Sequence, residues 1–223
     1  MKNNNKFRLD VWGAITLGTI ALYALFLLYP MAYLIRQSVL DSDTGSFTLA
    51  YFTKFFSKSY YFDTLINSFK VSITATVLSI AIGTPLAYLF TIFKIKGKPV
   101  LNILIVVASM SAPFIGAYSW ILLLGRSGII TTFFKNLGIA IPDIYGFGGI
   151  VLVMTLQLFP LVFLYAKGAL KNIDNSLIEA AENLGCSGIA CFFKVVVPLI
   201  MPTLLAAALL VFMRSFADFG TPM

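Results

Sequence analysis

The sequence contains no histidine and only two cysteines, Cys186 and Cys191. Histidine and cysteine side chains hold most protein-bound zinc and copper, so we expect no metal site built from this chain's side chains. The G-x-x-x-x-G-K-[S/T] phosphate-binding loop is also absent, which excludes ATP binding of that kind. Glu179 and Glu182 lack a histidine or metal partner. We therefore expect neither an enzyme nor a resident cofactor.

Charged residues are scarce as well. They make up 11% of the chain, against 59% hydrophobic residues, which is typical of an integral membrane protein. A bilayer core of about 30 Å needs about 20 helical residues per span, so 223 residues accommodate about five spans with their loops. The net charge of +7 is explained by membrane topology, and we expect no nucleic-acid partner.

The predicted fold is all-α, a polytopic bundle of transmembrane helices. Pro113 is predicted to kink the third span, and residues 36–63 form a polar loop whose many aromatic rings sit at the membrane interface. The five predicted spans cover residues 11–35, 65–93, 100–124, 148–169 and 202–219.

The segment between the fourth and fifth spans is polar and then amphipathic, unlike the apolar sequence on either side. Ser176 and Glu179 form the pattern of a capping box, which predicts a helix from about Leu177 with Glu179 in its first turn. Gly185 is predicted to end that helix in the left-handed conformation. One apolar stripe is expected on the helix: Ile173, Leu177, Ala181 and Leu184.

A second short helix is expected after this glycine. Ser187 is suited to cap it, and Pro198 is predicted to end it before the fifth span begins near Pro202. The two cysteines lie within this region and are interpreted as small packing residues. The sequence therefore predicts a helix-turn-helix elbow, and a partner protein could bind it.

The distribution of lysine and arginine predicts the orientation of the chain. Basic residues are more numerous on the side that carries the N-terminus and the elbow, so that side is expected to be cytoplasmic. The inside set is Lys2, Lys6, Arg8, Lys94, Lys96, Lys98, Lys167, Lys171 and Lys194, and the outside set is Arg36, Lys54, Lys58, Arg126 and Lys135.

Three polar residues within apolar surroundings are candidates for a solute path. Gln157 falls near the middle of the fourth span, where it either faces a path or makes an interhelical hydrogen bond. Arg214 and Asp218 are four residues apart near the end of the fifth span, a spacing that lets them pair on one helix face. Such a pair either marks a path or sits at the membrane interface.

The elbow resembles a known motif. Glu179-Ala180-Ala181, followed by Gly185 and a hydrophobic stretch to Pro198, is similar to the EAA loop of binding-protein-dependent ABC importer permeases. Three further segments resemble the same family: Asn67-Ser68, the run from Gly83 to Tyr88, and Gly97-Lys98. The heptapeptide from Phe216 to Pro222 resembles the iron(III) branch, with polyamine permeases as near relatives.

This resemblance implies a type I importer permease with a core over residues 65–223 and a coupling loop at 172–198. Residues 1–64 would hold the tail, the first helix and a periplasmic loop. The coupling residues would be Glu179, Ala180, Ala181, Gly185 and Pro198. The implied partners are a cytoplasmic ATP-binding subunit, a periplasmic or lipid-anchored solute-binding protein, a second permease half and membrane lipid. The implied location is the inner membrane.

Iron(III) is the solute that the resemblance favours, with spermidine or putrescine, thiamine and phosphonate as alternatives. A family core would continue with a sixth span after Met223, so we expect a fragment or the first half of a fused double permease. Two other classes stay open: a secondary transporter fragment, recognised by broken helices and a midplane ionisable residue, and a membrane scaffold or anchor.

Overall fold

A computed structural model describes residues 11–41, 45–93, 95–110, 113–139, 144–218 and 221. Within these ranges every regular element is a helix, as predicted, and one isolated bridge joins Leu40 to Phe47. The contacts divide the chain into two units, Met1–Thr64 and Leu65–Met223. Five helical segments of the described chain are long and apolar enough to cross a membrane: Val11–Val39, Ser59–Ile92, Ile115–Asn136, Phe147–Leu170 and Gly188–Phe216.

The first unit begins with a long apolar helix made of α1 (Val11–Tyr23), a π-helical turn η1 (Ala24–Leu28) and α2 (Tyr29–Val39). None of this segment's apolar window is buried within the chain, as expected for a helix whose surroundings are lipid. The next helix is α3 (Ala50–Ser57), which the predicted polar loop did not include. Aromatic rings pack locally at the end of this helix: Phe55 stacks on Tyr61 with centroids 5.4 Å apart.

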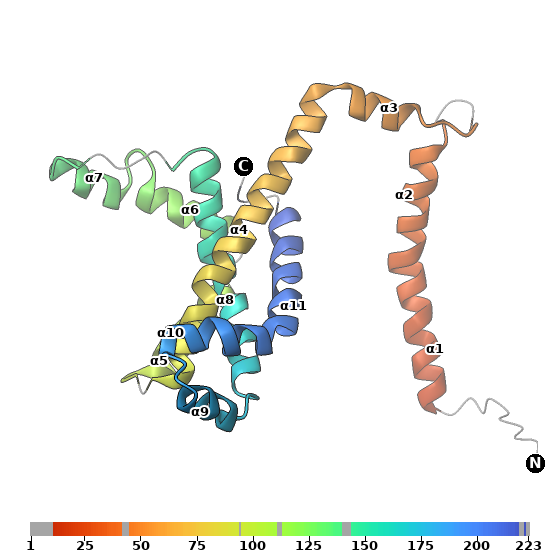
Figure 1. Cartoon of the computed structure of the whole chain (residues 1–223). Coiled ribbons are helices and arrows are strands. Elements are labelled where there is room, and N and C mark those ends of the chain that lie inside the picture. Colours follow the sequence, from red (N-terminus) through yellow and green to blue (C-terminus); the bar gives the residue numbers. More distant parts are fainter. Residues whose placement is uncertain are drawn as a thin grey trace, which may run out of the picture. The chain divides into compact units, whose positions relative to one another are not determined.

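The second unit contains the core, built from most of α4 (Ser59–Ile92), α8 (Phe147–Leu170) and α11 (Val197–Phe216). Figure 1 shows these three helices in yellow, teal and blue. The side chains of Val162, Phe163 and Ala166 on α8 are completely buried, and the ring of Phe90 on α4 meets that of Phe163 edge to face at 5.2 Å. Apolar burial from three helices therefore fixes this end of the bundle.

Small residues on α4 allow α8 to come close. Its buried positions Ser72, Ala75, Thr76, Ser79, Gly83, Thr84 and Ala87 recur at intervals of one to four residues along the helix. A Cβ added at Gly83 would lie 2.9 Å from both the backbone oxygen of Phe159 and the Cβ of Val162 on α8. Small residues at such a crossing are the usual device for helix association in membranes. Pro85 lies inside the same helix without ending it.

We expect Gly83→Ala to destabilise the second unit by about 1–3 kcal/mol, because the added methyl group forces α4 away from α8. The apparent melting temperature of the detergent-purified protein, followed by gel filtration after heating, measures this loss. Gly148→Ala is the matched control, since Gly148 lies on α8 with no atom within 4 Å of its added Cβ. Equal melting temperatures for the two variants would contradict the proposed close approach.

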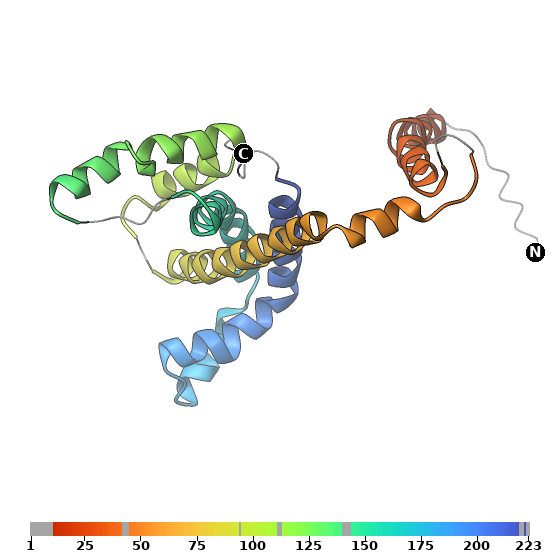
Figure 2. The same ribbon diagram turned by 90° about the horizontal axis from the view of Figure 1, so that it is seen from above.

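The third predicted span is not a single helix. The structure has α5 (Lys98–Ser109) and then α6 (Pro113–Leu124), followed by α7 (Ile129–Asn136). Pro113 begins α6 instead of kinking a continuous helix, because its missing N–H costs nothing at a first helical position. In Figure 2, α8 is seen nearly end-on while α6 and α7 run across the view. The predicted boundary at residues 100–124 was therefore wrong.

The fifth predicted span is longer than expected at its N-terminal side. Helix α10 (Gly188–Cys191), the π-helical turn η2 (Phe192–Val196) and α11 follow one another without a break. Pro198 is the second residue of α11, so the prediction that it ends a helix was wrong, as was a separate start near Pro202. Both π turns end two residues before a proline, η1 before Pro30 and η2 before Pro198. The wider turn accommodates the proline ring that would otherwise clash with the preceding carbonyls.

Candidate functional site

The elbow between α8 and α10 contains α9 (Asn175–Asn183). Helix α9 lies next to the C-terminal end of α8 (Figure 1). The backbone N–H of Ser176 donates to the Oδ1 atom of Asp174 at 3.0 Å, so Asp174 caps this helix. The helix begins two residues earlier than predicted. Glu179 consequently lies in the second turn, and no acidic residue is in the first. The capping box from Ser176 to Glu179 was therefore wrong.

Hydrogen bonds from Ser176, mainly from its backbone N–H and to a smaller extent from its side chain, lower the pKa of the Asp174 carboxyl from its ordinary value. Because the pKa of Asp174 is lower in the folded state than in the unfolded state, the ionised carboxylate stabilises the cap in full at pH values above the unfolded-state pKa. This stabilisation is lost as the pH falls through the folded-state pKa. We expect Asp174→Ala to raise hydrogen–deuterium exchange of the α9 amides at neutral pH. Asp174→Asn should keep exchange slow, because asparagine also caps helices. Equal exchange in all three proteins would contradict the cap.

Gly185 forms the bend of the elbow. Its φ angle is +85°, and the N–H of Cys186 donates to the carbonyl of Ala181 at 3.1 Å, which closes the end of α9 in the manner of a Schellman motif. No atom lies within 4 Å of a Cβ added here, so the requirement for glycine comes from the backbone angle and not from space.

The second half of the elbow is anchored in the core. Cys191 and Val196 have no exposed surface, and the Phe192 ring lies 4.7 Å from the Tyr88 ring on α4. Ile178 on α9 also packs against the core. These anchors fix the elbow to both α4 and α11. Neither Tyr88 nor Ile178 was predicted to have this role, because their burial depends on helices that are distant in sequence.

The elbow also carries exposed apolar side chains, which we call the elbow patch. The patch comprises Leu177 (49% exposed), Leu184 (90%), Ile189 (78%) and Phe193 (65%). Glu179 and Ala180 are exposed on the same short helix, whereas Ala181 is half-buried and Pro198 is exposed at the start of α11. The residues of the predicted apolar stripe therefore do not share one environment: Ile173 packs on the core, while Leu177 and Leu184 are exposed. Leu177 and Leu184 are exposed on the polar part of the elbow, where apolar residues are typical of a contact surface. Ile189 and Phe193 belong to the apolar segment Gly188–Phe216.

The three candidate path residues differ in their surroundings. Gln157 is half-buried on α8, and its side-chain oxygen has no hydrogen-bond partner within the described chain, so the structure does not supply the predicted interhelical bond to that atom. Asp218 accepts hydrogen bonds from the N–H and hydroxyl of Thr221, at 3.2 and 2.6 Å. Helix α11 ends at Phe216, so Asp218 lies beyond the helix that contains the exposed Arg214. The predicted pairing required both residues to lie four apart on one helix face, and this condition is not met.

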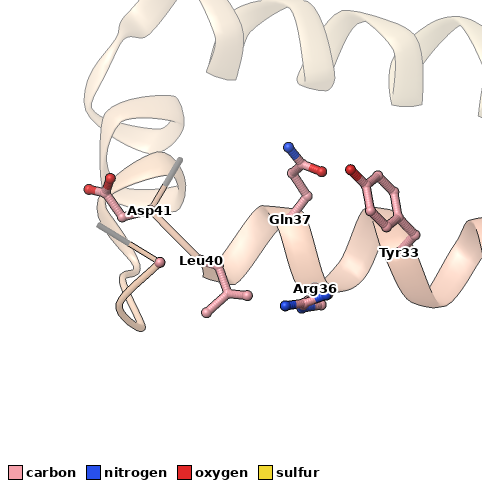
Figure 3. A pocket seen from close by; sticks show the side chains of 6 residues that line it. Tyr33, Arg36, Gln37, Leu40 and Asp41 are labelled. Atoms are coloured by element: carbon pink, nitrogen blue, oxygen red, sulfur yellow. The ribbon is translucent and has the colours of Figure 1, made fainter. Parts of the chain in front are cut away.

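Hollows in the described part of the chain include two that lie away from the elbow. One is in the first unit, where α2 meets the following turn, and it measures about 230 Å³; Figure 3 shows Tyr33 and Gln37 extending to the same side of α2. A smaller hollow of about 120 Å³ lies between α6 and the start of α8, beside Thr221. Within the described residues there is no group of three or more histidine, cysteine, aspartate or glutamate side chains that could hold a metal ion.

Comparison with known proteins identifies the class. Residues 46–222 match the family described as binding-protein-dependent transport system inner membrane component. This match covers most of the chain, and the chain belongs to that family. The fold agrees: a crystal structure of a bacterial ABC transporter involved in the import of the acidic polysaccharide alginate superposes with a TM-score of 0.71 at 17% identity, covering 95% of this chain and 79% of the other.

Two of the similar proteins are described as permeases for different solutes. The spermidine/putrescine transport system permease protein PotB of Haemophilus influenzae is 29% identical over 97% of this chain and 77% of its own. The ferric transport system permease protein FbpB of Actinobacillus pleuropneumoniae is 28% identical over 100% of this chain but only 32% of its own. The chain thus spans about a third of the ferric relative's length and about three quarters of the polyamine relative's. It is a multi-pass membrane protein of the ABC importer permease type.

Proposed function

We propose that this chain is the permease subunit of an ATP-driven importer and that the elbow receives the force from a separate ATP-binding subunit. The observation that supports this most directly is the elbow patch. Leu184, 90% exposed, projects from the polar part of the elbow, and Ile189, 78% exposed, is the second residue of the apolar segment Gly188–Phe216 that follows it. Apolar side chains in such a place contribute to binding when a partner removes them from water.

The anchoring of the elbow supplies a route for the force. Gly185 sets the angle between α9 and α10, and the helix continues from α10 through η2 into α11 without a break. Phe192 contacts Tyr88 on α4 at the same place. A displacement of the elbow would therefore move the ends of α11 and α4 together. In this proposal the docking face comprises Glu179, Ala180 and Ala181. Pro198 maintains the π turn η2, through which the helix continues from α10 into α11.

We propose that the permease core comprises residues 65–223 and that the coupling loop comprises residues 172–198. We also propose that the elbow and the N-terminus lie on the cytoplasmic side of the membrane. ATP hydrolysis would occur in the partner subunit. A second permease half and a periplasmic or lipid-anchored solute-binding protein would complete the importer. Gln157, Arg214 and Asp218 remain candidate residues for the solute path between the halves.

Iron(III) is proposed as the solute, and the similarity to the ferric permease over the full length of this chain supports it. A polyamine is the second candidate, because PotB is 29% identical and matches over a larger share of its own length. Uptake of radiolabelled iron(III) and of radiolabelled spermidine by membrane vesicles containing the assembled complex separates the two. ATP-dependent accumulation of iron alone supports the first proposal, and accumulation of spermidine alone supports the second. Accumulation of neither, in vesicles with active ATPase, excludes both.

A further inference from the structure

Helix α3 in the first unit has one aromatic side and one polar side. Successive residues of an α-helix are turned by about 100° around its axis. The aromatic residues of α3 therefore fall on one side, and Thr53, Lys54 and Ser57 fall on the other. Each aromatic side chain of this helix is between 37% and 59% exposed. Together with an exposed ring from the start of α4 they form a surface that we call the aromatic face: Tyr51, Phe52, Phe55, Phe56 and Tyr61.

Contacts between the rings hold the aromatic face together. The rings of Phe55 and Tyr61 are nearly parallel, with an angle of 13° between their planes, and Phe55 meets Phe56 edge to face at 5.3 Å. Lys58 lies between the two helices, and its Nζ atom is 5.7 Å from the centroid of the Tyr61 ring. Because Tyr61 is in the first turn of α4, these contacts give α3 a defined orientation relative to that turn.

The structure of α3 requires support from outside the helix. It has eight residues, and none of them is buried in the part of the chain that the structure describes. An isolated helix shorter than about 12–15 residues is only marginally stable in water. A surface that covers the aromatic face would stabilise the helix, because it would remove several exposed rings from water.

The direction of α3 indicates which surface this is. Within the first unit, α3 runs across the direction of α2, as Figure 1 and Figure 2 both show. Helix α2 completes the candidate membrane span Val11–Val39, and α4 begins the next candidate span directly after α3. A helix that connects two spans and runs across their direction lies parallel to the membrane surface. Aromatic rings on one side and a lysine on the other are typical of a helix in the membrane interface.

We infer that α3 is an interfacial helix and that its aromatic face binds the headgroup region of the bilayer, at the surface where the first span ends. Lys54 on the polar side and Lys58 after the helix favour anionic headgroups, and α3 contains no acidic residue. The sequence predicted interfacial rings within a loop, whereas the helix assigns them to one defined face. This role requires only that Val11–Val39 crosses the membrane, and it is independent of the proposed solute and ATP-binding subunit.

Depth-dependent fluorescence quenching tests this inference. The full-length protein has two tryptophans, Trp12 and Trp120, and both are replaced by phenylalanine before a new tryptophan is introduced. The variant Phe55→Trp is then reconstituted into vesicles of phosphatidylcholine and phosphatidylglycerol with brominated acyl chains. We expect these lipids to quench its fluorescence and to place the indole ring about 5–10 Å into the boundary between headgroups and acyl chains. Iodide in the aqueous phase should quench it only weakly.

Thr53→Trp is the matched control on the polar side of the same helix. Its indole ring should lie across the helix, whose diameter is about 10–12 Å, so iodide should quench it and brominated lipids should not. Phe52→Trp repeats the measurement on the aromatic face if the Phe55 variant does not elute as a single species in gel filtration.

Three results would overturn the inference. Strong iodide quenching of the tryptophan on the aromatic face, without lipid quenching, would show that this face lies in water. Protection from both reagents would show that a protein covers the face instead of lipid. Equal lipid quenching at positions 53 and 55 would show that α3 does not lie in the interface with one side toward the lipid.

Discussion

Replacing Gly185 by aspartate is expected to lower ATP-driven solute uptake by about tenfold while the protein still inserts into the membrane at normal levels. Gly185 has a φ angle of +85°, and an L-residue in that conformation costs about 1–2 kcal/mol. The bend relaxes toward negative φ, and α9 no longer holds its angle to α10. The membrane spans are unaffected, because a side chain at this position meets no atom within 4 Å.

The measurements for this variant are solute uptake by vesicles and the amount of permease in the membrane fraction. Gly188→Asp is the matched control: it places the same charge in the same elbow, at a helical glycine that likewise has no atom within 4 Å of an added Cβ. We expect the control to keep most of the uptake. Similar losses in both variants would indicate that charge, and not the backbone bend, disturbs the elbow.

Replacing Leu184 by serine is expected to weaken binding of the ATP-binding subunit by roughly tenfold or more, a size typical of an interface hot spot. Leu184 is 90% exposed in the chain, so its loss should change the stability of the isolated permease by less than about 0.5 kcal/mol. The effect therefore falls on the complex alone. The affinity of the detergent-purified subunits for each other measures it.

The control for this prediction is Leu137→Ser. Leu137 is 60% exposed at the end of α7, outside the elbow, and its replacement should leave the affinity unchanged. If Leu184→Ser left the affinity unchanged, the elbow patch would not be the docking surface. If both variants weakened binding equally, the contact would be a general property of exposed apolar residues.

The fold class could be predicted from the sequence because it depends on composition and length. The long apolar segments required helices, and the glycine at position 185 required a bend whatever surrounds it. The positive φ angle of Gly185 agrees with that expectation. Local chemistry of this kind is encoded within a few residues, so a sequence alone indicates it.

The errors came where two local rules compete. Asp174 and Ser176 are both good capping residues, and the choice between them determined whether Glu179 lies in the first or second helical turn. Pro198 ends a helix in isolation, but a π turn before it allows the helix to continue. Pro113 was expected to bend a span and instead begins a helix. These outcomes depend on the conformation of the backbone before each residue, and a sequence pattern does not determine that conformation.

The candidate site was predicted only in part. The sequence indicated the elbow residues but not which side chains are exposed, because that depends on contacts such as Phe192 with Tyr88 on α4. The spacing of Arg214 and Asp218 predicted a pair only while both stayed in one helix, and the helix ends at Phe216. The contacts between distant helices and the residue at which α11 ends could not be predicted from the sequence.

The central claim is that the elbow faces the compartment that contains the ATP-binding subunit. Both cysteines of the chain lie in the elbow, Cys186 half-buried and Cys191 buried. Labelling with a membrane-impermeant maleimide is therefore the most direct test, with exposed Ser187→Cys as a second site and Cys186→Ser as the blank. The account predicts labelling in inside-out vesicles and none in right-side-out vesicles. Labelling in right-side-out vesicles would contradict it.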